Sequence, residues 1–303
     1  MTVLQKVLNT LKRPDDSKTI TLYLIRHGEA EHNIVEKRAT AHAKEQALRE
    51  GWPPDELQRR MEEARAQVLD DPRLFDPPLT DRGAMEARDC RARLQALLAH
   101  ETDHHPTTDS LTPPTCVLVS PLQRALQTAD LIFPDVENIH VREELRERMT
   151  GLPCDSRHRF DDLRSRKSFS RFSMRRLDLK DRILGWITLP TTIDDTASDE
   201  ENLSADVPFR GLDNGIAAQT VPTPLTSEDI KALRKRTELL FKVLLEFDET
   251  SIAVVSHKGY LRELERAQFG MKESPLYGNG EVRVYRVELS KRRLKLLEVK
   301  RLR

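Results

Sequence analysis

The stretch TITLYLI at residues 19–25 runs directly into Arg26, His27 and Gly28, and this junction decides the fold. A short, mostly apolar run predicts a strand that is covered on both faces, as the strands of parallel sheets are. The residues that follow it are charged, titratable or small. They stand at the end of a buried strand, which is where open α/β sheets bind their ligands.

Two further runs repeat this arrangement. CVLV at residues 116–119 leads into Ser120, and IAVV at residues 252–255 leads into Ser256 and His257. Both are short enough to be fully buried strands. If they lie parallel to the first strand, their polar ends meet at one edge of the sheet.

Two other segments complete the expected sheet. VRVYRVEL at residues 282–289 alternates in polarity, which predicts an edge strand, and residues 293–299 are its expected hairpin partner. A shorter strand is expected at residues 139–141. Helical patterns separate the strands and cover residues 55–69, 80–98, 121–132 and 227–247.

The helix boundaries carry local signals. Thr80 is a good N-cap, Pro121 suits a first helical position, and residues 227–247 begin at Thr226 or Ser227. Strands that alternate with helices predict a layered α/β protein. We therefore expect a three-layer α/β/α fold with a mainly parallel central sheet.

The chain, residues 1–303, is expected to be a single domain with two insertions. Residues 32–76 form a long charged insertion, and residues 154–224 form a longer, irregular one. The second holds eight Lys or Arg residues between positions 157 and 176, followed by the acidic run DDTASDEEN at 194–202. We expect it to be a partly mobile cap over the site.

Composition limits the possible partners. Fifty basic residues balance fifty acidic ones, so no global field favours nucleic acid or an anionic membrane, and neither is expected as a partner. Cys90, Cys116 and Cys154 show no paired spacing and are expected to be packed thiols in a reducing compartment. The cytoplasm is expected, with the nucleus as a second compartment. No metal-binding spacing is recognisable, so neither a metal nor another cofactor is expected.

Arginine and histidine at strand ends suit phosphoryl transfer. A neutral imidazole nitrogen can attack phosphorus and hold the phosphoryl group covalently. A guanidinium binds two phosphate oxygens at once, and Arg124 lies near a predicted helix start that also favours anions. A carboxylic acid must protonate the leaving oxygen, and the candidates lie in REELRER at residues 142–148.

Five motifs in the same order resemble those of the histidine phosphatase superfamily, which includes cofactor-dependent phosphoglycerate mutases and fructose-2,6-bisphosphatase. They are LYLIRHGEAEHN (22–33), PLTDRGAMEA (78–87), SPLQRALQTA (120–129), LRERMTG (145–151) and VVSHKG (254–259). The resemblance spans roughly residues 20–290, apart from the middle insertion. The longer run LRERMTGLPCDSR (145–157) is similar to the phosphoglycerate-mutase-like proteins common in fungi.

Carried over residue by residue, the resemblance implies one nucleophile, one general acid and base, and four phosphate-binding side chains. The nucleophile is His27, and the acid and base is Glu147. The phosphate-binding side chains are Arg26, Asn33, Arg124 and His257. The implied activity is metal-independent hydrolysis of a small phosphorylated metabolite through a phosphohistidine intermediate.

Each of these residues also has an ordinary structural explanation. Buried histidines are often only packed, Arg124 could pair with a surface carboxylate, and Asn33 could be a turn residue. Glu147 shares a charged run with Glu143 and Glu144, either of which could be the acid instead. Six further histidines, which lack metal-ligand spacing, are expected at the surface or in loops. They are His32, His42, His104, His105, His140 and His158.

The basic stretch at residues 157–176 allows three interpretations. It could be a solvated face with Phe160, Leu163, Phe169 and Phe172 buried, or a lid that adds positive charge over an anionic substrate. Nucleic-acid binding is the third, disfavoured by the neutral chain as a whole.

Two other functions remain open from the sequence. A phosphoglycerate mutase would use the same phosphohistidine, but mutases carry a phenylalanine-threonine-glycine-tryptophan segment soon after the first motif. This chain has IVEKRATAHAKEQ at residues 34–46 instead. A non-catalytic phosphate-binding protein is disfavoured because every catalytic residue type is present at its motif position.

Overall fold

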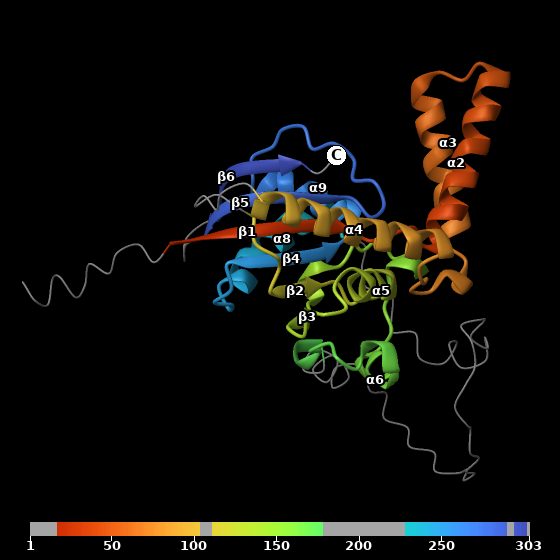
Figure 1. The fold of residues 1–303 in the computed structure, drawn as a ribbon. Helices are drawn as coiled ribbons and strands as arrows, with labels where there is room; N and C mark the ends of the chain where they lie inside the picture. Colours follow the sequence, from red (N-terminus) through yellow and green to blue (C-terminus); the bar gives the residue numbers. More distant parts are fainter. Residues whose placement is uncertain (1–16, 104–110, 178–227, 290–293, 302–303) are drawn as a thin grey trace, which may run out of the picture.

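The computed structural model describes residues 17–103, 111–177, 228–289 and 294–301, which contain one six-stranded sheet in the order β3-β2-β4-β1-β5-β6 (Figure 1). The strands are β1 (Lys18–Arg26), β2 (Cys116–Val119), β3 (Ile139–Val141), β4 (Ser251–Ser256), β5 (Val282–Leu289) and β6 (Leu294–Arg301). The first four pair in parallel, whereas β5 is antiparallel to both β1 and β6. The predicted mainly parallel sheet is confirmed.

Helices cover both faces of this sheet (Figure 1). The longer helices are α2 (Glu31–Glu50), α3 (Pro54–Leu69), α4 (Asp81–Asp103), α5 (Gln123–Ile132), α8 (Ile230–Leu244) and α9 (Lys258–Ala267). Alternate β1 side chains enter two separate cores: Tyr23 joins residues of α4 and α5, and Leu24 joins residues of α8 and α9. A strand buried on both faces explains the apolar run that the sequence shows here.

The expected edge position of β5 is wrong. This strand lies between β1 and β6, so β6 is the edge. The error comes from Arg283, which the alternating pattern marks as solvent-facing. Its side chain is buried, and Nη1 donates to Glu265 Oε2 at 2.9 Å, so an internal ion pair occupies this position.

Two helix starts also differ from expectation. Helix α5 begins at Gln123, two residues after Pro121, which therefore precedes the helix. Helix α8 begins at Ile230, and Asp229 caps it by accepting from Ala232 N at 2.7 Å. The prediction for Thr80 is confirmed, since its Oγ1 accepts from Gly83 N at 3.0 Å.

Residues 32–76 form mainly the α2–α3 hairpin, which stands away from the sheet in Figure 1. The chain leaves and returns at nearly one point. Glu31 N donates to Pro78 O at 3.3 Å, and Thr80 N donates to Glu29 O at 2.9 Å. The hairpin therefore extends from a closed neck, which is why a long charged segment does not disturb the sheet.

The described part of the second insertion packs on the core. Phe160, Leu163, Phe169 and Phe172 are buried, as the interpretation of a packed aromatic face requires. Arg157 is also buried, with Nε donating to Glu143 Oε2 at 2.8 Å, so it is not a solvent-facing charge. Residues 178–224, including the acidic run 194–202, lie outside the described residues, and a cap function stays a prediction.

None of the described helices is long and apolar enough to cross a membrane. Within the described ranges, no three His, Cys, Asp or Glu side chains gather in a way that could hold a metal ion. The cysteines are free and buried, and burial raises the pKa of the Cys90, Cys116 and Cys154 thiols to about 12. His104 and His105 lie outside the described residues.

Candidate active site

The carboxyl ends of three parallel strands bring the predicted residues together. His27 follows β1, His257 follows β4, and Ser120 follows β2. The two imidazole rings lie 5.0 Å apart between centroids, and both are almost fully buried. His257 Nε2 lies 2.7 Å from Ser120 Oγ. The expected meeting of strand ends is thus present.

The neighbourhood of His27 defines which ring nitrogen is available. His27 Nδ1 lies 2.6 Å from Gly28 O. A carbonyl oxygen only accepts, so Nδ1 carries the proton and Nε2 keeps its lone pair. His27 therefore has one nitrogen used for orientation and the other free for chemistry.

The electrostatics keep both rings neutral. Burial lowers the pKa of His27 well below 6.5, and the positive charges of Arg124 and Arg26 lower it further. The pKa of His257 is lowered in the same way, by burial first and Arg124 second. Near neutral pH both histidines are therefore uncharged imidazoles, the form that can act as a nucleophile.

Two buried arginines supply the positive charge. Arg26 Nη1 donates to Tyr277 O at 2.7 Å, and Arg124 Nη1 donates to Cys154 O at 2.8 Å. Each guanidinium is therefore oriented by one backbone carbonyl. The Nε atoms of both arginines are buried and have no hydrogen-bond partner among the described residues. Buried donors without partners are costly, and a bound anion would satisfy them.

Glu147 lies at the start of α9. Its Oε2 accepts from Gly259 N at 3.1 Å, and its Oε1 accepts from Tyr260 N at 3.2 Å. These are free N–H groups of the first helical turn, which favour a carboxylate. Glu147 also contributes to the electrostatic environment of Arg26, whose pKa burial lowers and Glu147 raises. The Glu147 carboxylate therefore lies near the guanidinium of Arg26.

Gly259 is needed for this arrangement. A Cβ atom at position 259 would lie 2.3 Å from Glu147 Oε1. No real side chain fits at that distance without moving the carboxylate. The glycine of the VVSHKG motif therefore has a direct physical explanation: it makes room for Glu147.

A second close approach fixes the loop that carries His27. A Cβ on Gly28 would lie 2.2 Å from Gly83 O, and a Cβ on Gly83 would lie 1.9 Å from Glu29 O. The two glycines let the backbone after β1 touch the first turn of α4. This contact joins the RHG motif to the PLTDRG motif, although more than 50 residues separate them.

Asn33 is placed in the first turn of α2, with both ends of its amide engaged. Its Oδ1 accepts from Ala30 N at 3.0 Å, and its Nδ2 lies 3.0 Å from His32 Nε2. The side chain therefore serves the helix start. This arrangement agrees with the alternative of a local structural residue.

The expectation that His32 lies at the surface or in a loop is wrong. Its ring is buried in the first turn of α2, 6.1 Å from that of His27, and burial lowers its pKa well below 6.5. The neck of the hairpin folds His32 inward. Of the other histidines, His42 is exposed, and His140 and His158 are half-buried.

Three neighbouring residues were not identified from the sequence. Asp155 is buried with Oδ1 3.9 Å from Arg124 Nη2. Asp76 is buried and accepts from Gln123 N at 2.8 Å, at the start of α5. Thr128 Oγ1 accepts from Gly28 N at 3.1 Å. Thr128 belongs to SPLQRALQTA and Asp155 to LRERMTGLPCDSR, whereas Asp76 lies outside the quoted motifs.

Comparisons with known proteins were made for the family, the sequence and the fold. A family model described as the histidine phosphatase superfamily (branch 1) matches residues 72–179. This segment includes Arg124 and Glu147 but neither of the two site histidines. No curated protein matches the sequence significantly.

Solved structures similar to the chain include three phosphatases. One is the alpha-ribazole phosphatase from Shigella flexneri, at 20% identity, covering 92% of this chain and 96% of that chain with a TM-score of 0.43. Another is phosphoserine phosphatase from Entamoeba histolytica in complex with 3-phosphoglyceric acid, at 17% identity, 93% and 98% coverage and a TM-score of 0.43. The third is the mycobacterial glucosyl-3-phosphoglycerate phosphatase, at 14% identity, 94% and 100% coverage and a TM-score of 0.45. Over residues 72–179, the family match confirms the predicted resemblance to the histidine phosphatase superfamily.

Proposed function

We propose that the chain is a phosphoric monoester hydrolase that acts on a small phosphorylated metabolite through a phosphohistidine on His27. One observation carries the proposal. A neutral, buried imidazole with Nε2 free lies in the field of two buried arginines whose Nε donors have no partner among the described residues. This combination suits a nucleophile beside a site for an anion.

In the first step, His27 Nε2 attacks phosphorus. A P–N bond forms while the P–O bond to the leaving group breaks. Arg26 and Arg124 hold the equatorial oxygens through charge-assisted hydrogen bonds. Glu147, in its protonated form, gives its proton to the leaving oxygen. The leaving alcohol departs neutral, and the phosphoryl group stays on His27.

His257 completes the phosphate contacts in this proposal. The hydroxyl of Ser120 can donate to His257 Nε2, 2.7 Å away, which leaves the proton of the ring on Nδ1. That Nδ1 is buried without a partner among the residues that the structure describes. A phosphate oxygen would accept from it. Asn33 stays a predicted phosphate contact: one hydrogen of its Nδ2 points to His32 Nε2, and the second can donate to a phosphate oxygen.

In the second step, water attacks the phosphohistidine. The P–N bond breaks, inorganic phosphate leaves, and Glu147 as carboxylate takes the proton of the water. The positive charge that stabilises the transition state comes from Arg26 and Arg124, and the neutral His257 ring adds a hydrogen bond, so no metal is required for this route. Both half-reactions use the same side chains in the same positions.

The partner and compartment follow from the same features. A formal net charge of zero favours a small phosphorylated metabolite over nucleic acid. Three buried free thiols suit a reducing compartment, for which the cytoplasm, or also the nucleus, stays the prediction.

The test is a panel of phosphorylated metabolites assayed for phosphate release after dialysis against EDTA. The proposal predicts metal-free release for at least one alkyl phosphate and for para-nitrophenyl phosphate, and none with His27→Ala. Activity that returns only with Mg²⁺ or Zn²⁺, or that persists in His27→Ala, would contradict it. Isomerisation of a phosphoglycerate without release would favour the mutase.

A further inference from the structure

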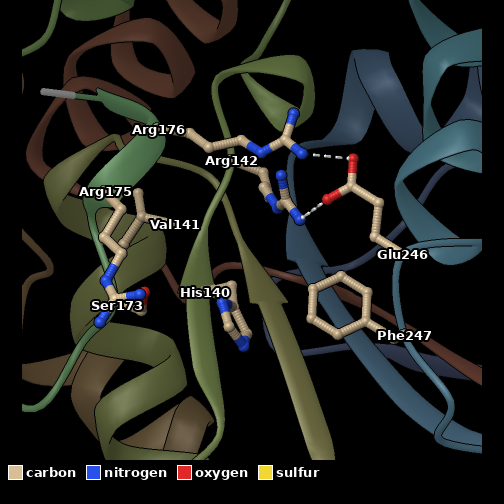
Figure 2. A pocket seen from close by; sticks show the side chains of 8 residues that line it. All are labelled: His140, Val141, Arg142, Ser173, Arg175, Arg176, Glu246 and Phe247. Atoms are coloured by element: carbon tan, nitrogen blue, oxygen red, sulfur yellow. Dashed lines mark hydrogen bonds and ion pairs between the residues drawn. The ribbon is translucent and has the colours of Figure 1, made fainter. Parts of the chain in front are cut away.

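A second positively charged pocket lies beside the edge strand β3, and none of the proposed catalytic residues lines it (Figure 2). Its volume is about 280 Å³, at the small end for ligand sites. Its side chains come from β3, from the segment after the short helices of the second insertion, and from the turn after α8. The residues that define its chemistry are His140, Arg142, Arg175, Arg176, Glu246 and Phe247.

Arg142 is the unusual member of this pocket. Only 4% of its surface is exposed, yet its Nε and Nη1 have no hydrogen-bond partner within the described part of the chain. The guanidinium lies over the Phe247 ring, 5.3 Å from the centroid. Nε and Nη1 together carry three of the five N–H donors of the guanidinium. A buried cation with these donors unused is costly, and an added acceptor would lower that cost.

The carboxylate of Glu246 shows how an anion can bind in this pocket. Its Oε2 lies 2.5 Å from Arg142 Nη2, and its Oε1 lies 2.7 Å from Arg176 Nη2, so one carboxylate bridges two guanidinium groups (Figure 2). Arg175 also lines the pocket. The lining therefore contains three arginines and one carboxylate, an excess of positive charge, although only Arg142 and Arg176 contact Glu246.

The aromatic surroundings limit the kind of ligand. One face of Phe247 is covered by Arg142, and its ring makes an edge contact with His140 at 4.8 Å between centroids. Little aromatic surface is therefore free to stack on a base or another flat group. The small volume and the arginine forks instead favour a compact, multiply charged oxyanion.

We propose that this pocket is a second anion site that binds a phosphate group, with Arg142 and Arg176 as the main ligands and Glu246 as an internal competitor. The ligand takes the place of the Glu246 carboxylate between the two arginines and uses the free donors of Arg142. Nothing in this proposal depends on the chemistry of His27, and it can be tested by binding alone.

The test is isothermal titration calorimetry of the full chain with inorganic phosphate at low salt. The parent is expected to bind two phosphates, one at each site. Arg176→Met should weaken the second binding event about tenfold, and Arg142→Met should abolish it. Arg164→Met, at an exposed arginine outside the pocket, is the matched control and should retain both events.

Glu246→Gln separates a ligand site from a purely structural ion-pair cluster. Removing the competing charge should tighten the second event about tenfold, a gain that no structural role predicts. This variant and Arg176→Met keep the test decisive if Arg142→Met fails to fold. Unchanged affinity in both would overturn the proposal, as would a single phosphate per chain in the parent that Arg142→Met leaves intact.

Discussion

The cluster around His27 and the α2–α3 hairpin are both rich in charge, but they use it in opposite ways. In the hairpin, exposed side chains pair along the helices: Arg59 contacts Glu56 and Glu63, each at 2.6 Å. At the cluster, Arg26 and Arg124 are buried, and protein carbonyls satisfy only part of their donors. The exposed ion pairs satisfy each other's charges and so offer no binding site. The buried N–H donors that lack a partner can instead donate to a ligand.

The energetic consequences differ accordingly. Exposed ion pairs are screened by water and salt and contribute little to stability. Buried cations without full pairing cost stability, and the protein retains that cost where a ligand offsets it. Substitutions at the cluster should therefore act on catalysis, and substitutions of the exposed ion pairs in the hairpin should have almost no effect.

Among substitutions that leave His27 in place, the largest loss of kcat is expected for Glu147→Gln. Loss of the proton donor should lower kcat about 10²- to 10⁴-fold for alkyl phosphates, whose leaving oxygen needs protonation. For para-nitrophenyl phosphate, whose phenol is acidic, the loss should be much smaller. The control is Glu144→Gln in the same run, and a loss there with Glu147→Gln unaffected would move the role to Glu144.

A smaller effect is expected for Gly259→Ala. The added Cβ would lie 2.3 Å from Glu147 Oε1, so the carboxylate must move, and displacement of about 1 Å can cost about 10²-fold in rate. The matched control is Gly278→Ala, whose Cβ meets the Glu281 side chain at an ordinary 3.5 Å. Equal kcat for Gly259→Ala and the parent would show that Glu147 need not occupy this position.

The buried histidines should make stability depend on pH. Burial lowers the folded-state pKa of His27, His32 and His257 well below 6.5. Below pH 6.5 the unfolded chain binds protons that the folded chain rejects, so stability falls as pH falls through the window between the two pKa values. Above pH 6.5 this loss vanishes.

His32→Gln removes the contribution of one of these imidazoles to the pH dependence of stability. Its unfolding free energy should fall less steeply below pH 6.5, by up to about 1.4 kcal/mol per pH unit relative to the parent. Denaturant unfolding at a series of pH values measures this difference. Asp76 and Asp155, whose pKa values burial raises, act in the opposite sense but equally in both proteins. Parallel pH profiles would mean that His32 titrates normally in the folded state.

The smallest effect is expected for Arg59→Ala in the hairpin. It removes exposed pairs with Glu56 and Glu63, which water and salt already screen. Tm and kcat/KM should equal those of the parent within error. A large loss of activity would show that the hairpin belongs to the working site, and the contrast between the two regions would fail.

The sequence predicts well the site residues that follow the parallel strands. His27, Arg124 and His257 follow or lie near apolar runs, and a parallel sheet necessarily brings such ends together. Their proximity is a consequence of topology, so a correct sheet gives a correct cluster.

The sequence predicts poorly the contacts that depend on how a long insertion folds. His32 is buried only because the hairpin closes at its neck, where Thr80 N meets Glu29 O. Asp155 lies near Arg124 because the start of the second insertion packs against α5, where Cys154 O accepts from Arg124 Nη1. Both residues stand in the quoted runs 22–33 and 145–157, but nothing local in those runs predicts burial, and their charged neighbours suggest solvent instead.

The central claim is that phosphate is transferred to His27. The direct test is brief exposure to ³²P-labelled substrate, an alkaline quench that preserves phosphohistidine, and peptide mapping. The account predicts acid-labile, alkali-stable label on the peptide that contains His27, and no label in His27→Ala. Label on a serine, a cysteine or an aspartate, or equal label in His27→Ala, would contradict it.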